Sequence, residues 1–101
     1  MKLREIAHSR TGDKGNISNI SLIAYEEADY PLLVEKVTPE RVREWFGDMI
    51  QGEVVRYQLP QLAAMNFVIY GALGGGVTRS LSLDPHGKSL SSHLLDIEIQ
   101  P

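Results

Sequence analysis

Residues 38–52, TPERVREWFGDMIQG, carry the clearest structural signal in the sequence. Thr38 can cap a helix, and Pro39 suits the first helical position, where no amide hydrogen is needed. Apolar residues then recur at i, i+3, i+4, i+7 and i+8, namely Val42, Trp45, Phe46, Met49 and Ile50. Gly52 is well placed to end the helix. The stretch therefore predicts an amphipathic helix over 39–51 with one face on a core.

Alternating apolar and polar residues on both sides of this helix predict strands. The expected strands cover residues 2–8, 17–25, 54–59, 81–83 and 95–99. The first two form a hairpin in this interpretation, joined by a loop over 9–16. The strand at 54–59 stops at Pro60, and a turn follows at 84–87.

Two further segments bear on the fold class. Pro31 starts a short helix over 31–36. Residues 61–73 could form a helix or a strand. Residues 66–70 have strand propensity. We expect a helix, because the segment has one apolar helical face and is bounded by Pro60 and Gly74. The sum is an α+β domain, with a mainly antiparallel sheet of four or five strands and two helical segments on one face.

The composition predicts a single domain over residues 1–101. The chain has 101 residues, no cysteine and a net charge of −3. The missing cysteines exclude disulfides, thiol nucleophiles and zinc–thiolate sites, and fit a reducing compartment. No apolar stretch reaches the roughly 20 residues of a membrane span. We therefore expect a cytoplasmic protein that binds neither membrane nor nucleic acid.

The segment 9–16 is the first candidate site. Its two glycines expose backbone amides, and its basic and hydroxyl side chains could wrap a phosphate or a carboxylate. The ligand-binding candidates here are Ser9, Arg10, Thr11, Gly12, Asp13, Lys14 and Gly15. It is not a Walker loop, because the spacing to the lysine differs. The alternative is a long hairpin loop with ordinary turn chemistry.

The segment 71–80 is the second candidate site. Three consecutive glycines allow the backbone to lie close to a ligand, and Arg79 offers a fork for an oxyanion. The candidates in this segment are Gly75, Gly76, Thr78, Arg79 and Ser80. The alternative is a helix cap followed by a connector. We expect the two basic segments to converge, so that Arg10 and Arg79 face one anionic ligand.

Some isolated residues add weaker signals. Asn66 is polar within an apolar stretch and is a ligand-binding candidate, although such an amide more often satisfies nearby backbone, and Asn19 is equivalent. Arg56 can face the loops or pair with an acid on the helical face. Asp13 is a possible general base. The three histidines lack metal-ligand spacing, so we expect neither a bound metal nor a cofactor.

The order of these motifs resembles the AtuA-like domain over about residues 3–99. The blocks that match are 7–16, 56–60, 66–67, 74–81 and 84–88. That domain forms the C-terminal part of acyclic terpene utilisation proteins and also occurs as separate short chains. The resemblance implies a ferredoxin-like two-layer sandwich and a context in the catabolism of branched or isoprenoid acids. It does not transfer a defined reaction.

Three functions follow as hypotheses. In the first, the chain is a stand-alone subunit or accessory module that lacks the large N-terminal region of the longer proteins. It would bind an acyl-CoA phosphate or a carboxylate at the junction with a separately encoded larger subunit. In the second, Asp13 is the base of a small lyase, hydratase or isomerase. In the third, the domain is structural and forms a homo-oligomer through its uncovered sheet face.

Overall fold

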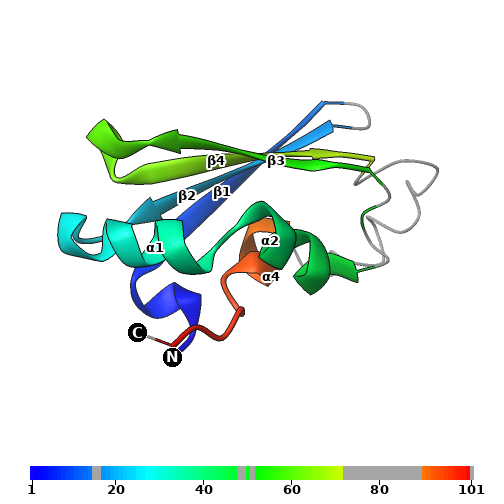
Figure 1. Cartoon of the computed structure of the whole chain (residues 1–101). Helices are drawn as coiled ribbons and strands as arrows, with labels where there is room; N and C mark the ends of the chain where they lie inside the picture. The colour runs from blue at the N-terminus through cyan, green and yellow to red at the C-terminus, as the bar shows by residue number, and fades with distance from the viewer. Residues whose placement is uncertain (15–16, 48–49, 51, 72–89, 101) are drawn as a thin grey trace.

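The protein, described here from a computed structural model, has a four-stranded sheet with helices on one face (Figure 1). The structure describes residues 1–14, 17–47, 50, 52–71 and 90–100. The strands are β1 (Ala7–Lys14), β2 (Ile17–Ala24), β3 (Val54–Leu59) and β4 (Ala64–Tyr70). The helices are α1 (Tyr30–Lys36), α2 (Pro39–Phe46) and α4 (Leu90–Leu94), with short 3-10 turns at Leu3–Glu5, Glu27–Asp29 and Pro60–Leu62.

The sheet has the strand order β1-β2-β4-β3, and every neighbouring pair is antiparallel. The α+β expectation and its four-strand version therefore hold. The expected strand over 81–83 and the turn over 84–87 lie outside the described residues.

One face of the sheet packs on the helices. In β2 every second residue is buried, from Ser18 to Ala24, and β4 alternates in the same way. The largest fully buried side chains come from both layers: Leu3, Ile20, Leu22, Leu33, Val37, Val42, Phe46, Met65, Phe67, Ile69, Leu94 and Ile97. The core thus lies between the sheet and the helix layer.

Figure 1 places α1, α2 and α4 together on this side of the sheet. The opposite face carries the alternate residues of all four strands, and no described helix lies over it. We call it the open sheet face.

The central helix is shorter than the sequence pattern predicts. Thr38 caps it as expected, because its Oγ1 accepts a hydrogen bond of 3.1 Å from the Arg41 amide. The helix ends at Phe46 because Gly47 adopts a positive φ of 56° and its amide bonds back to the Arg43 carbonyl. The predicted end at Gly52 was wrong. Ile50 is still buried, so the apolar stripe extends past the helix.

The expected helix over 61–73 was also wrong. A 3-10 turn and Ala63, in the left-handed conformation with φ 51°, reverse the chain after β3. Ala64–Tyr70 then returns as β4, a central strand of the sheet. Met65, Phe67 and Ile69 are buried in alternation, as in a strand, and Phe67 does not belong to the helical face that the sequence suggested.

Both ends of the chain differ from the sequence expectation. The expected strand over 2–8 was wrong, because residues 3–5 form a 3-10 turn and β1 runs from Ala7 to Lys14. Its pairing with β2 in a hairpin is confirmed. The expected strand at 95–99 instead begins with a turn at residues 95–96 and continues outside the sheet, with one bridge from Glu98 to Lys2. Backbone bonds join Leu3 to Ile97 and Met1 to Ile99, which places the termini side by side (Figure 1).

Candidate functional site

The predicted loop over 9–16 is largely a strand, and this divides its residues between two faces. β1 pairs with β2 from Ala7 to Lys14 without interruption. Successive side chains of a strand point to opposite faces, so Ser9 and Thr11 face the helices, while Arg10 and Gly12 lie on the open sheet face. The loop expected over 9–16 is thus wrong for residues 9–14, while ligand binding by this segment stays a prediction.

Ser9 and Thr11 hold helix α4 against the sheet. The Ser9 hydroxyl donates to the Ser91 carbonyl at 2.9 Å, and the Ser91 amide donates to Thr11 Oγ1, also at 2.9 Å. Ser91 is buried, so these bonds satisfy backbone groups at the start of the helix. The two hydroxyls thus have a structural role in the described fold.

The remaining candidates of this segment are only partly described. Asp13 pairs with Ser18 and Lys14 with Ile17 in the hairpin, and only the backbone of these two candidates is described. The role of Asp13 as a base therefore stays a prediction. Gly15, Gly75, Gly76, Thr78, Arg79 and Ser80 lie outside the described residues, so the convergence of Arg10 with Arg79 stays a prediction as well.

Arg10 and Asn66 lie in one row across the open sheet face. The register aligns Arg10 with Ser21, Ser21 with Asn66, and Asn66 with Tyr57, so one residue of each strand contributes. Arg10 and Tyr57 are exposed at the two edges, and the central pair is half-buried. The row brings together two of the predicted ligand-binding residues.

The centre of the row is a hydrogen-bonded amide cluster, formed by Asn19, Ser21 and Asn66. Asn66 Nδ2 donates to Asn19 Oδ1 at 3.0 Å, and the Ser21 hydroxyl donates to Asn66 Oδ1 at 3.4 Å. The sequence analysis favoured bonds from these asparagines to nearby backbone. In the structure the two side chains bond to each other instead. Ser21 was missed, since strand alternation alone does not show which strands become neighbours.

Large apolar side chains surround this amide cluster. The exposed ones in the described chain are Ile17, Tyr25, Tyr57, Leu59, Leu62 and Tyr70. Strand alternation places Ile17, Tyr57, Leu59 and Tyr70 on the open sheet face, and Tyr25 stacks on His8 of that face at 5.1 Å between ring centroids. Leu62 belongs to the adjoining turn between β3 and β4. The exposed apolar surface therefore gathers on and around one face.

Arg56 lies on the other side of the sheet. Its guanidinium donates to the carbonyls of Val34 at 2.8 Å and Val37 at 3.0 Å, at the end of α1. These are carbonyls that a helix leaves without internal partners. Among the described residues Arg56 pairs with no acid, and its bonds to these carbonyls cap the helix.

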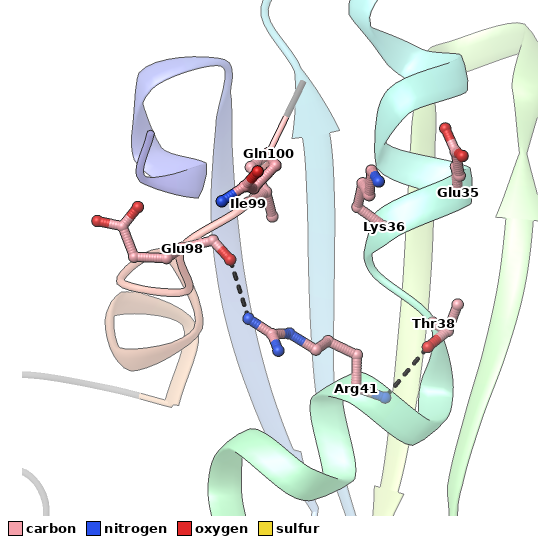
Figure 2. A pocket seen from close by; sticks show the side chains of 7 residues that line it. All are labelled: Glu35, Lys36, Thr38, Arg41, Glu98, Ile99 and Gln100. Atoms are coloured by element: carbon pink, nitrogen blue, oxygen red, sulfur yellow. Dashed lines mark hydrogen bonds between the residues drawn. The ribbon is translucent and has the colours of Figure 1, made fainter.

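A cavity of about 350 Å³ lies on the helix side, between α1, the start of α2 and the C-terminal segment (Figure 2). Glu35, Lys36, Arg41 and Glu98 line it, so its charges are mixed. Arg41 donates to the Glu98 carbonyl at 2.9 Å, which ties the C-terminal segment to the helix layer. None of the predicted site residues that the structure describes lines this cavity.

A second, wider hollow of about 580 Å³ runs along Pro39, Glu40, Arg43 and residues 52–54. Its described lining contains no predicted site residue either. Within the described ranges, no three His, Asp or Glu side chains gather closely enough to hold a metal ion. Over the same residues, no helix combines the length and apolar character that a membrane crossing requires. The open sheet face is thus the strongest candidate for a functional surface.

The architecture defines the class: an α+β domain whose antiparallel four-stranded sheet is covered by helices on one face. The model of the AtuA ferredoxin-like domain matches residues 1–100, and the chain belongs to this family. No curated protein and no solved structure matches the chain significantly. The family assignment confirms the resemblance drawn from the sequence motifs.

Proposed function

We propose that this domain is an accessory module that docks on a larger partner through its open sheet face. One observation carries the proposal: the exposed large apolar side chains of the described chain gather on and beside this face. Contiguous exposed apolar surface on a small domain marks an interaction site, because its burial is the main favourable term in association. Tyrosines are enriched at such surfaces.

The composition of the face favours a different protein over a second copy. Its described residues include the cation Arg10 and the amide cluster but no aspartate or glutamate. Two such faces packed together would bring the same excess of donors into contact without a carboxylate to receive them. A partner that supplies acceptors would satisfy them.

We further propose that an anionic group is bound at this junction, near Arg10 and Asn66. In the family context this group would be an acyl-CoA phosphate or a carboxylate in the catabolism of branched or isoprenoid acids. We propose that the domain acts in the cytoplasm, and the absence of cysteine from the sequence supports this location.

Co-expression with a protein that carries the N-terminal region of the longer AtuA proteins tests the docking. Tyr57→Asp places a charge within the apolar surface, and we expect it to weaken the complex at least about tenfold, or ~1.4 kcal/mol. Glu44→Lys, which makes a larger charge change on the helix layer, should leave the affinity unchanged. Calorimetry on the purified pair measures both.

Two results would contradict the proposal. In one, Tyr57→Asp and Glu44→Lys weaken the complex equally, so that the open sheet face has no special role. In the other, light scattering finds a stable homodimer that Tyr57→Asp dissociates, while the larger protein does not bind. That second result would favour the self-associating domain.

A further inference from the structure

The amide cluster contains amide hydrogens that no bond within it uses. Asn19 and Asn66 each carry two amide hydrogens, and Ser21 carries one hydroxyl hydrogen. Two of these five hydrogens are used within the cluster, in the bonds from Asn66 to Asn19 and from Ser21 to Asn66. Within the described part of the chain, the Asn19 amide nitrogen has no acceptor, so three amide hydrogens are available to a bound group.

Arg10 adds a positive charge beside these donors. It is the cross-strand neighbour of Ser21, and only strand β2 separates it from Asn66, so its long side chain can extend over the row. The guanidinium is a planar fork that matches two oxygens in one plane. Among the described residues of this face there is no carboxylate to pair with it.

We infer that Arg10 and the amide cluster form a carboxylate-binding site in the middle of the docking surface. Both carboxylate oxygens would accept from the Arg10 fork, and the free amide hydrogens of Asn19 and Asn66 would donate to the oxygen nearer the cluster. This assignment deepens the proposed function and rests on it. A partner docked on the open sheet face would exclude water from the site and strengthen these hydrogen bonds.

The donor set favours a carboxylate over a phosphate. Phosphate sites are built largely from successive backbone N–H groups in turns or at helix starts. Here β2 and β4 are the two central strands, paired on both sides, so their backbone amides are used in the sheet ladder. The donors that remain are side-chain amides and one guanidinium.

Titration of the ¹⁵N-labelled domain tests the inference without any partner. The probes are sodium acetate and sodium phosphate, at ionic strength matched with sodium chloride. We expect acetate to shift the side-chain amide signals of Asn19 and Asn66 saturably. Arg10→Gln should raise the acetate Kd about tenfold, while Arg43→Gln, which removes an exposed arginine from the helix layer, should leave it unchanged.

Asn66→Asp provides a second test should Arg10→Gln disturb the edge strand. It keeps the shape of the side chain but puts a negative charge in the cluster, so the response of the Asn19 amide to acetate should disappear. A native backbone spectrum confirms folding. The inference is overturned when acetate leaves the amides unshifted, when phosphate alone shifts them, or when Asn66→Asp binds acetate normally.

The carboxylate could belong to a free organic acid or to an acidic side chain of the docked partner. Spectra of the complex distinguish these sources. Amide shifts that appear on docking without added acid, and that acetate cannot compete away, assign the carboxylate to the partner. Shifts that require acetate assign it to a free acid. Docking that persists while acetate fails to bind would overturn the site and leave the docking proposal intact.

Discussion

Gly52 and Gly12 occupy sites that differ in the room they leave for a side chain. A Cβ atom at Gly52 would press on the carbonyl group of Tyr70, with the carbonyl carbon only 2.7 Å away. A Cβ atom at Gly12 would meet nothing within 4 Å. The first glycine permits close packing of two backbone segments, and the second has no such role in the described fold.

We predict that Gly52→Ala lowers the free energy of unfolding by about 1–3 kcal/mol, the usual cost of overpacking. Gly12→Ala should leave it unchanged within about 0.5 kcal/mol, or raise it slightly, because glycine weakens a strand interior. Urea unfolding followed by circular dichroism measures both. Equal losses in the two variants would contradict the packing argument at Gly52.

At the scale of elements, the junction of sheet and helix α1 depends on one side chain. Arg56 donates to two carbonyls at the end of the helix and is half-buried there. Arg56→Met keeps most of the apolar stem but removes both bonds, so we expect a loss of about 1–2 kcal/mol in unfolding free energy. Arg56→Lys retains one charged donor, so its unfolding free energy should lie between those of the wild type and the Met variant. A Met variant as stable as the wild type would exclude the capping role.

Helix α4 is held by the hydroxyl of Thr11. Thr11→Val is nearly isosteric but removes the acceptor of the buried Ser91 amide, so unfolding should become easier by about 1–2 kcal/mol. Thr11→Ser keeps the oxygen and serves as the control. In thermal unfolding, Thr11→Ser should have a higher melting temperature than Thr11→Val. The reverse order would show that the methyl group of Thr11 contributes more to stability than the hydrogen bond.

These contacts explain how far the sequence could predict the elements. Helix α2 and strands β2 and β3 follow from local periodicity, since each has one apolar face. Strand β1 could not be predicted in this way, because Ser9 and Thr11, which point inward, carry hydroxyl groups. Their hydrogen-bond partners belong to α4, some 80 positions later in the sequence. Local rules interpret such a polar, glycine-containing segment as a loop.

The candidate site was predictable only in part for a related reason. Arg10 and Asn66 stood out as polar residues in unusual settings. Their position in one row depends on the pairing of β1 with β2 and of β2 with β4, which is a property of the tertiary structure. Local periodicity supports a helix or a strand equally well for 64–70, so it could not place Asn66 beside Ser21.

At the scale of the whole molecule, the two ends of the chain are joined. The backbone bonds between residues 1–4 and 95–99 are accompanied by an ion pair in which Arg4 donates to Asp96. This hydrogen bond from Arg4, with the charges of Arg4, Lys2 and His93, lowers the pKa of the Asp96 carboxyl below its ordinary value of 3.8. The pair is largely exposed, so its contribution to stability is at most about 1 kcal/mol.

The lowered pKa sets the direction of a pH effect. Because the folded state favours the charged carboxylate, the stabilisation is fully present above the ordinary pKa and is lost as the pH falls through the lowered one. We therefore predict that the coupling energy between Arg4→Met and Asp96→Asn, from a double-mutant cycle in urea, is measurable at pH 7 and declines at acidic pH below about 4. High salt should weaken it at pH 7, because the charges are exposed. A coupling that stayed constant from pH 7 to the acid limit of folding would show that the contact does not depend on the carboxylate charge, and that the backbone bonds alone join the two ends.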